Sequence, residues 1–135
     1  MLGVSVSAAT PKRYRPGPSI WTASAARAKK HGASLRWESD PREAVRGADV
    51  VYTDVWVSMG NEAERKQRLA AFRPYQLNRA LLKHAKPGCR IMHCLPAHRG
   101  EEITDEAMEG KGSLIFEQAV NRLHVQKALL RFLFA

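Results

Sequence analysis

The chain has 135 residues, of which 44% are hydrophobic and 26% are charged, and its formal net charge is +9. This length fits one domain with a buried core, and this composition argues against disorder. No apolar run approaches the roughly 18 residues that a membrane span needs, and residues 1–10 lack the basic start and apolar core of a signal peptide. We therefore expect a globular protein of the cytoplasm with no membrane partner.

The alternation of apolar runs and capped, amphipathic stretches predicts strands and helices in turn along the chain. Strands are expected over residues 4–9, 34–38, 48–53, 88–93 and 113–116. Helices are expected over residues 19–31, 41–46, 62–71, 76–85, 104–106 and 121–134. Strands that alternate with helices indicate βαβ units. We therefore predict an α/β fold, in which one doubly wound, Rossmann-like parallel sheet is flanked by helices.

The positive charge raises the question of nucleic-acid binding. Residues 1–46 hold nine basic and three acidic side chains, but these are spread over several predicted elements and do not form one stripe. Neither zinc-finger spacing nor interleaved aromatic and basic residues accompany them. We expect a basic surface that attracts an anionic substrate, and no nucleic-acid partner.

A first reactive motif occupies residues 93–100, His-Cys-Leu-Pro-Ala-His-Arg-Gly, directly after a predicted strand. Pro96 has no N–H and so ends any ladder. Reactive side chains just past the carboxyl end of a strand are where open α/β sheets bind ligands, which indicates an enzyme site. Alternatively, Cys94 is a small buried apolar residue. A zinc site would need a second ligand cluster, which the sequence lacks, so no metal is expected.

A second motif occupies residues 54–60, Asp-Val-Trp-Val-Ser-Met-Gly. Asp54 closes a buried strand, where a carboxylate is costly unless it meets a cation or hydrogen-bond donors. Ser58 adds a hydroxyl group, and Gly60 lets the loop bend. The set suits a ligand that carries an ammonium group, although Asp54 could instead cap the following segment and Met59 could fill the core.

Together, in this order, the two motifs resemble the ornithine-binding half of the ornithine carbamoyltransferases. Four further segments match the same family: Leu-Gly at 2–3 followed by a strand to Ala-Thr-Pro at 9–11, Phe-Arg-Pro-Tyr-Gln-Leu-Asn at 72–78, Glu-Ile-Thr-Asp at 102–105 and Asn-Arg-Leu-His at 121–124. The resemblance covers essentially the whole chain. It implies transfer of the carbamoyl group from carbamoyl phosphate to the δ-amine of L-ornithine, giving L-citrulline and phosphate, as in arginine biosynthesis and the urea cycle. It implies no cofactor and no metal, and a homo-oligomer built from trimers.

The resemblance also assigns roles to individual residues. Asp54, Ser58 and Met59 would hold the amino-acid end of ornithine. Cys94 would lie near the δ-amine, and the backbone carbonyls of Cys94 and Leu95 would orient the carbamoyl amide. Arg122 would bind carbamoyl phosphate, since its fork of donors matches oxyanions, although by itself it reads as a surface charge. The catalytic residues would then be Cys94, Asp54 and Arg122.

The chain also departs from the family. The phosphate-binding Ser-Thr-Arg-Thr-Arg motif is absent, as are the first strand and helix of the ornithine-binding domain. We therefore interpret residues 1–135 as a partial ornithine-binding domain without the carbamoyl-phosphate domain, weakly active or inactive alone. The absent strand would lie between those at 4–9 and 48–53 and would leave two unpaired edges. Alternatives are a non-catalytic amino-acid-binding or interaction module, or a carbamoyltransferase for putrescine or a modified ornithine.

Overall fold

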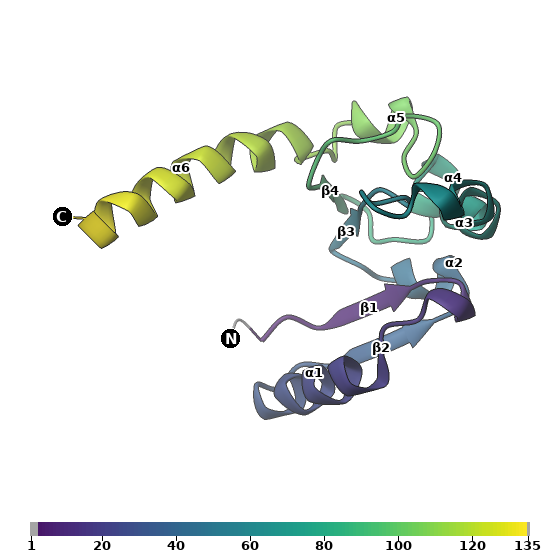
Figure 1. The fold of residues 1–135 in the computed structure, drawn as a ribbon, viewed down its shortest axis with the longest axis horizontal. Coiled ribbons are helices and arrows are strands. Elements are labelled where there is room, and N and C mark those ends of the chain that lie inside the picture. The colour runs from purple at the N-terminus through teal and green to yellow at the C-terminus, as the bar shows by residue number, and fades with distance from the viewer. Residues whose placement is uncertain (1–2, 135) are drawn as a thin grey trace.

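Parallel strands and helices alternate along residues 3–134, the part of the chain that the computed structural model describes (Figure 1). The strands are β1 (Val6–Ala9), β2 (Leu35–Glu38), β3 (Val50–Thr53) and β4 (Arg90–His93). The helices are α1 (Pro18–Lys30), α2 (Pro41–Val45), α3 (Arg65–Phe72), α4 (Arg79–Leu82), α5 (Asp105–Met108) and α6 (Ile115–Phe134). Short 3-10 turns occupy Lys12–Tyr14, Glu62–Glu64 and Arg73–Tyr75. The predicted α/β class is confirmed.

Local capping groups explain where several helices begin. Asp40, Asn78 and Thr104 each precede a helix and accept a hydrogen bond from a backbone N–H in its first turn. Such a bond satisfies a donor that has no partner inside the helix. Gly32, with φ +67°, follows the end of α1 in a conformation that favours glycine. These starts and stops agree with the sequence to within a few residues.

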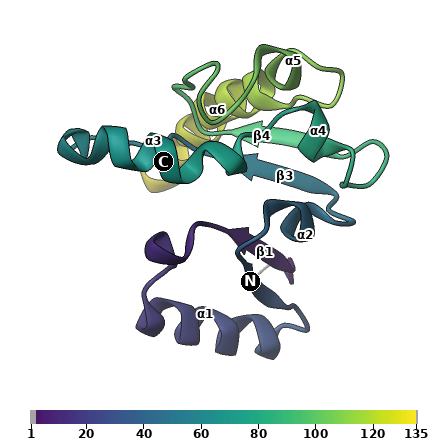
Figure 2. The same ribbon diagram turned by 90° about the vertical axis from the view of Figure 1, so that its right-hand side faces the viewer.

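The expected parallel pairing is present, but the strands form two separate pairs and not one hydrogen-bonded sheet. β1 pairs with β2, with Val6 opposite Leu35, and β3 pairs with β4, with Val50 opposite Arg90. Within residues 3–134, β1 and β3 do not pair, and their ribbons lie apart (Figure 2). Both strands line a groove of about 830 Å³. Strands can form hydrogen bonds only at a spacing of about 4.8 Å, so β1 and β3 cannot bond across this groove. The unpaired edges expected for these two strands are therefore present.

The prediction of a strand at residues 113–116 was wrong. Ser113 forms only an isolated parallel bridge with Ile91, and α6 begins at Ile115 rather than at residue 121. Two hydrogen bonds hold this short stretch to β4, from the Ile91 N–H to the Gly112 carbonyl and from the Leu114 N–H to the Ile91 carbonyl. Ile115 is fully buried, and the chain turns into a helix directly at this contact. Apolar periodicity alone did not distinguish the end of the strand from the start of the helix.

The core lies around β4 and beneath the loop that follows it. The buried side chains of this cluster are Val45, Leu77, Leu81, Ile91, Ile103, Ala107, Met108 and Ile115. Burial of each larger one contributes about 1.5–3 kcal/mol. The backbones of Leu77 and Ile103 lie in an isolated bridge, with hydrogen bonds on either side of it. The end of the loop after β4 is therefore hydrogen-bonded to the core at Leu77.

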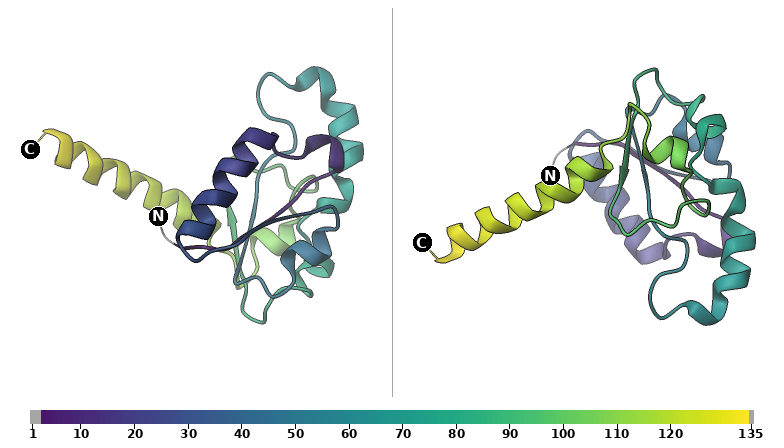
Figure 3. Two further views of the ribbon diagram at one scale, coloured as in Figure 1. Left: turned by 90° about the horizontal axis from the view of Figure 1, so that it is seen from below. Right: turned by 90° about the horizontal axis from the view of Figure 1, so that it is seen from above.

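Helix α6 leaves this core and extends away from the rest of the chain (Figures 1 and 3). Its first turns pack against β4, and large apolar side chains are exposed along its whole length. These exposed residues are Phe116, Val120, Leu123, Val125, Leu129, Leu130, Phe132, Leu133 and Phe134. Among the described helices, none is both long and apolar enough to cross a membrane.

Candidate active site

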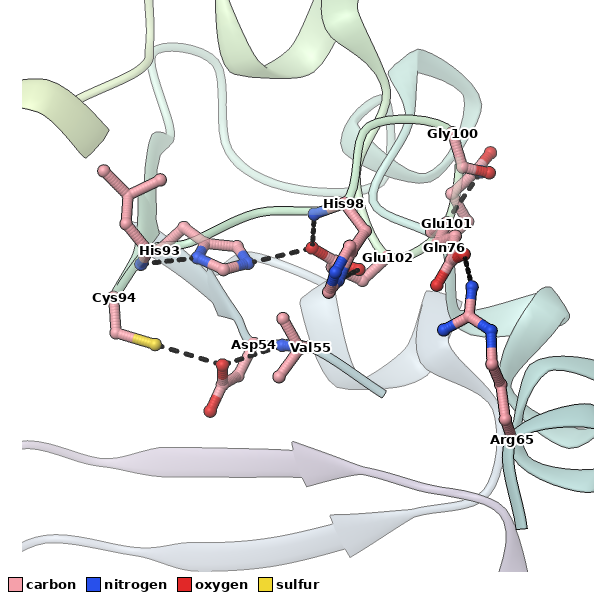
Figure 4. Close-up of polar contacts among 11 residues, drawn as sticks. Asp54, Val55, Arg65, Gln76, His93, Cys94, His98, Gly100, Glu101 and Glu102 are labelled. Atoms are coloured by element: carbon pink, nitrogen blue, oxygen red, sulfur yellow. Dashed lines mark hydrogen bonds and ion pairs between the residues drawn. The ribbon is translucent and has the colours of Figure 1, made fainter. Parts of the chain in front are cut away.

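Asp54 and Cys94 meet at the carboxyl edge of the β3–β4 pair. Thr53 lies opposite His93 in this parallel pair, so the residue after each strand emerges at the same edge. The Cys94 thiol donates a hydrogen bond to Asp54 Oδ1 over 3.0 Å, and the same oxygen accepts the Val55 N–H over 2.7 Å (Figure 4). The two strand ends that the sequence singled out therefore form one site.

The protonation state of Cys94 follows from these surroundings. Burial raises the pKa of the Cys94 thiol, and the neighbouring Asp54 carboxylate raises it further through the hydrogen bond and through repulsion of a thiolate. Tyr52 acts in the opposite direction. The thiol is therefore protonated near neutral pH, and Cys94 serves as a hydrogen-bond donor rather than as a thiolate nucleophile.

Tyr52 and Gln118 extend this site and were missed by the sequence reasoning. The Tyr52 hydroxyl accepts a hydrogen bond from Gln118 Nε2 over 3.1 Å, and Tyr52 and Cys94 influence the pKa of one another. Burial raises the pKa of the Tyr52 hydroxyl, and the hydrogen bond from Gln118 acts in the opposite direction. Tyr52 lies two residues before Asp54 on one strand, and side chains of period two share a face, which could have revealed it. Gln118 gave no such signal, because the start of α6 was misplaced.

The turn after β4 is held by a buried polar pair. His93 is 1% exposed and Glu102 is fully buried, and His93 Nε2 lies 3.2 Å from Glu102 Oε1. His93 Nδ1 accepts the Leu95 N–H over 2.8 Å, and Glu102 Oε1 also accepts the His98 N–H over 2.6 Å. Leu95 has φ +56°, in the left-handed region that side chains other than glycine rarely adopt. The sequence reasoning did not identify Glu102 as part of the site.

Within residues 3–134, two groups of side chains lie close enough together to be considered for a metal. In the first, Asp54, His93 and Cys94, both nitrogens of His93 already have partners. In the second, which includes His98, Glu101 forms an ion pair with Arg65 and Glu102 Oε1 accepts two hydrogen bonds. The donors of both groups are therefore committed to holding the loop, and neither arrangement fits a metal.

Of the other predicted site residues, one lies near Asp54 and Cys94 and two do not. Ser58 lines the same groove as Asp54. The Met59 side chain is 96% exposed, so it does not pack at this site. Arg122 lies on the exposed part of α6 and takes part in no hydrogen bond or ion pair among the described side chains. The structure therefore brings Asp54, Cys94 and Leu95 together, with Ser58 along the groove, but not Met59 or Arg122.

Residues 1–133 match the family described as aspartate/ornithine carbamoyltransferase, Asp/Orn binding domain. The chain belongs to this family. It is 56% identical over 130 residues to the ornithine carbamoyltransferase of Archaeoglobus fulgidus, covering 96% of this chain and 41% of that protein. It is 52% identical over 130 residues to that of Bacillus subtilis, with the same coverage of 96% and 41%. The chain thus spans about two fifths of the length of these curated relatives.

Solved carbamoyltransferase structures show the same fold. The ornithine carbamoyltransferase from Pyrococcus furiosus is 50% identical with a TM-score of 0.87, over 94% of this chain and 41% of that one. The anabolic enzyme from Campylobacter jejuni is 41% identical with a TM-score of 0.90, over 97% of this chain and 43% of that one. A mutant N-acetyl-L-ornithine transcarbamylase is 27% identical with a TM-score of 0.80, over 94% of this chain and 39% of that one.

Proposed function

We propose that this chain forms the amino-acid-binding side of an ornithine carbamoyltransferase. The contact between the Cys94 thiol and the Asp54 carboxylate carries the proposal, because it puts an anion and a neutral donor at one strand edge. The names of the relatives support it, since proteins about 50% identical to this chain are ornithine carbamoyltransferases. The lower identity to the N-acetyl-L-ornithine enzyme favours ornithine as the acceptor.

The proposed reaction joins the δ-nitrogen of L-ornithine to the carbonyl carbon of carbamoyl phosphate. The δ-ammonium group first loses a proton, because only the neutral amine has a lone pair for the attack. The lone pair forms the new C–N bond, the C–O bond to phosphate breaks, and its electron pair leaves with the phosphate. The phosphate takes up one of the two protons that the nitrogen loses, and the other is released to solvent. The products are L-citrulline and phosphate.

Asp54 supplies the negative charge for an ammonium group of ornithine. Its Oδ1 already accepts from Cys94 and Val55, and Figure 4 shows the second oxygen turned away from Cys94, on the side of β1 and β2. The groove on that side is lined by Asp54 and Ser58. A carboxylate with one committed oxygen keeps a fixed orientation while the other oxygen pairs with the ligand. Ser58 can add a hydroxyl contact, and Met59 would join only if its loop moved.

The Cys94–Leu95 turn supplies neutral donors and acceptors for the reacting groups. The protonated thiol lies beside the carboxylate, and the backbone carbonyls of Cys94 and Leu95 can accept from the carbamoyl amide. The φ of +56° at Leu95 sets the direction of this backbone. Arg122 would pair with the phosphate end, as an arginine does with oxyanions. Both cysteines are free thiols, which fits a reducing compartment, so we place the reaction in the cytoplasm. By the resemblance to the family, we also propose a homo-oligomer built from trimers.

A hybrid enzyme tests this proposal. Residues 1–133 would replace the matching segment of the Bacillus subtilis ornithine carbamoyltransferase, and citrulline formation would be measured with L-ornithine. Putrescine and N-acetyl-L-ornithine would serve as competing acceptors. We expect turnover with L-ornithine and much less with either alternative. A folded hybrid that binds L-ornithine but transfers nothing would instead support a non-catalytic binding module.

A further inference from the structure

We propose that His93 and Glu102 are positioning residues that hold the Cys94–Leu95 turn in the shape that the reaction requires. Their link to catalysis rests on the proposed function, whereas their hold on the turn can be measured independently. Neither side chain needs to touch a substrate for this role, since both are buried behind the turn. Glu102 acts on His93, and His93 acts on the backbone of Leu95.

The first link is the hydrogen bond from Leu95 N–H to His93 Nδ1, at 2.8 Å. Leu95 has φ +56°, where its Cβ crowds the neighbouring carbonyl, so this conformation persists only when other contacts fix it. The bond spans only two residues and therefore closes a tight turn around Cys94. Loss of the Nδ1 acceptor would release the Leu95 backbone to a commoner conformation.

The second link is the choice of tautomer. Because Nδ1 accepts a hydrogen bond, the single ring proton of neutral His93 lies on Nε2, which then donates to Glu102 Oε1 over 3.2 Å. In the other tautomer, two N–H groups would point at each other across the turn, and Glu102 would face a lone pair. Glu102 therefore selects the form of His93 that can hold Leu95.

The third link anchors the far side of the same loop. Glu102 Oε1 also accepts the His98 N–H over 2.6 Å, so one carboxylate oxygen contacts both ends of the segment that contains Cys94 and Leu95. The Cys94 thiol, held between these anchors, reaches Asp54 Oδ1 at 3.0 Å. Any rotation of the turn would move the thiol away from the carboxylate.

The burial of Glu102 indicates more than packing. A fully buried carboxylate is costly, and an apolar pair of similar size would fill the same space without that cost. The second oxygen of Glu102 is buried, has no hydrogen-bond partner among the described residues and lies 3.9 Å from His98 Nδ1. The carboxylate provides one oxygen that accepts from the His93 imidazole and from the His98 N–H of the loop.

Two substitutions of His93 distinguish the role of Nδ1 from the role of Nε2. In His93→Asn the amide oxygen can take the place of Nδ1, whereas in His93→Gln the longer amide reaches the place of Nε2. In the 135-residue chain, we expect the Leu95 amide proton to exchange with solvent about tenfold faster in His93→Gln than in His93→Asn, as for loss of one hydrogen bond. Equal protection in both variants would overturn the proposal.

The tautomer is read directly from the ¹⁵N signals of the His93 ring in the unsubstituted chain, which needs no variant to fold. We expect the proton on Nε2, also in Glu102→Gln, whose amide oxygen can still accept it, but a mixture of tautomers in Glu102→Ala. A proton on Nδ1 in the unsubstituted chain would refute the proposal. In the hybrid enzyme, His93→Asn should retain more of the kcat than His93→Gln at similar ornithine KM. An inactive hybrid would count against the proposed function. The ¹⁵N signals of the His93 ring would then decide whether His93 and Glu102 hold the turn.

Discussion

The Cys94 thiol and the Asp54 carboxylate are 40 positions apart in the chain and lie 3.0 Å apart, between Sγ and Oδ1. The parallel register of β3 and β4 produces this contact, since each residue directly follows its strand and the two strands end side by side. The contact leaves Cys94 a neutral donor and Asp54 an oriented anion.

The first prediction concerns the reactivity of Cys94. Its pKa is raised by burial and then by Asp54, so at any pH below that pKa the thiolate fraction is reduced and alkylation is slow. Asp54→Asn removes the negative charge, which lowers the pKa and increases the thiolate fraction. We expect iodoacetamide to label Cys94 roughly threefold faster or more in Asp54→Asn at pH 7.5. Cys89 is the internal control: its pKa is raised mainly by burial, and its rate should not change.

The second prediction concerns ornithine binding. In the hybrid enzyme, Asp54→Asn should raise the KM for L-ornithine at least about tenfold and leave the KM for carbamoyl phosphate nearly unchanged, because it removes the charge that faces an ammonium group. Asp49→Asn is the matched control, since Asp49 lies at the opposite end of the same strand in an exposed ion pair with Lys86. Unaltered steady-state kinetics for ornithine in Asp54→Asn would remove Asp54 from the site.

The third prediction concerns Arg122. Arg122→Ala in the hybrid should raise the KM for carbamoyl phosphate by about tenfold with little effect on ornithine, as expected for loss of a charged hydrogen bond to an oxyanion. Arg131→Ala, on a later turn of the same helix, is the control and should have no effect. If both variants behave alike, Arg122 is an ordinary surface charge.

The fourth prediction is that the 135-residue chain alone forms no citrulline at a significant rate. Transfer requires both substrates in attack geometry, and most of the acceleration depends on fixing the phosphate end. Within residues 3–134, Arg122 forms no hydrogen bond or ion pair with Asp54 or Cys94, so it is not held beside them. A colorimetric citrulline assay beside a Cys94→Ala control is the measurement. Robust activity that disappears in the control would contradict this expectation.

The fifth prediction concerns the support under the loop. Ile103→Ala should lower the free energy of unfolding by about 2–5 kcal/mol, because Ile103 is fully buried at the bridge to Leu77. Ile20→Ala is the control: Ile20 is 68% exposed, so the change should stay within about 0.5 kcal/mol. Urea denaturation followed by circular dichroism measures both. If the free energy of unfolding fell by a similar amount in both variants, the packing of Ile103 at this bridge would not be important for stability.

Features that depend on neighbouring residues were predictable from the sequence. The helix starts after Asp40 and Thr104 follow from a side chain that caps its own first turn. The polar groups at Asp54 and Cys94 were predictable as strand ends, because an apolar run that stops at a carboxylate or at His-Cys-Leu-Pro marks the edge of a sheet. The α/β class followed from the alternation of elements along the chain.

Relations between residues distant in the chain could not be predicted in this way, because they depend on how the whole chain packs. Strand pairing depends on which edges come within bonding distance, and β1 and β3 do not, so one predicted sheet became two pairs. The start of α6 was decided by the burial of Ile115 against β4, and with it the position of Arg122 away from Asp54. Glu102 was recognisable as an anchor only once its carboxylate was seen beside His93 and His98, since hydrogen bonds between buried groups depend on how the loop folds back and leave no period in the sequence.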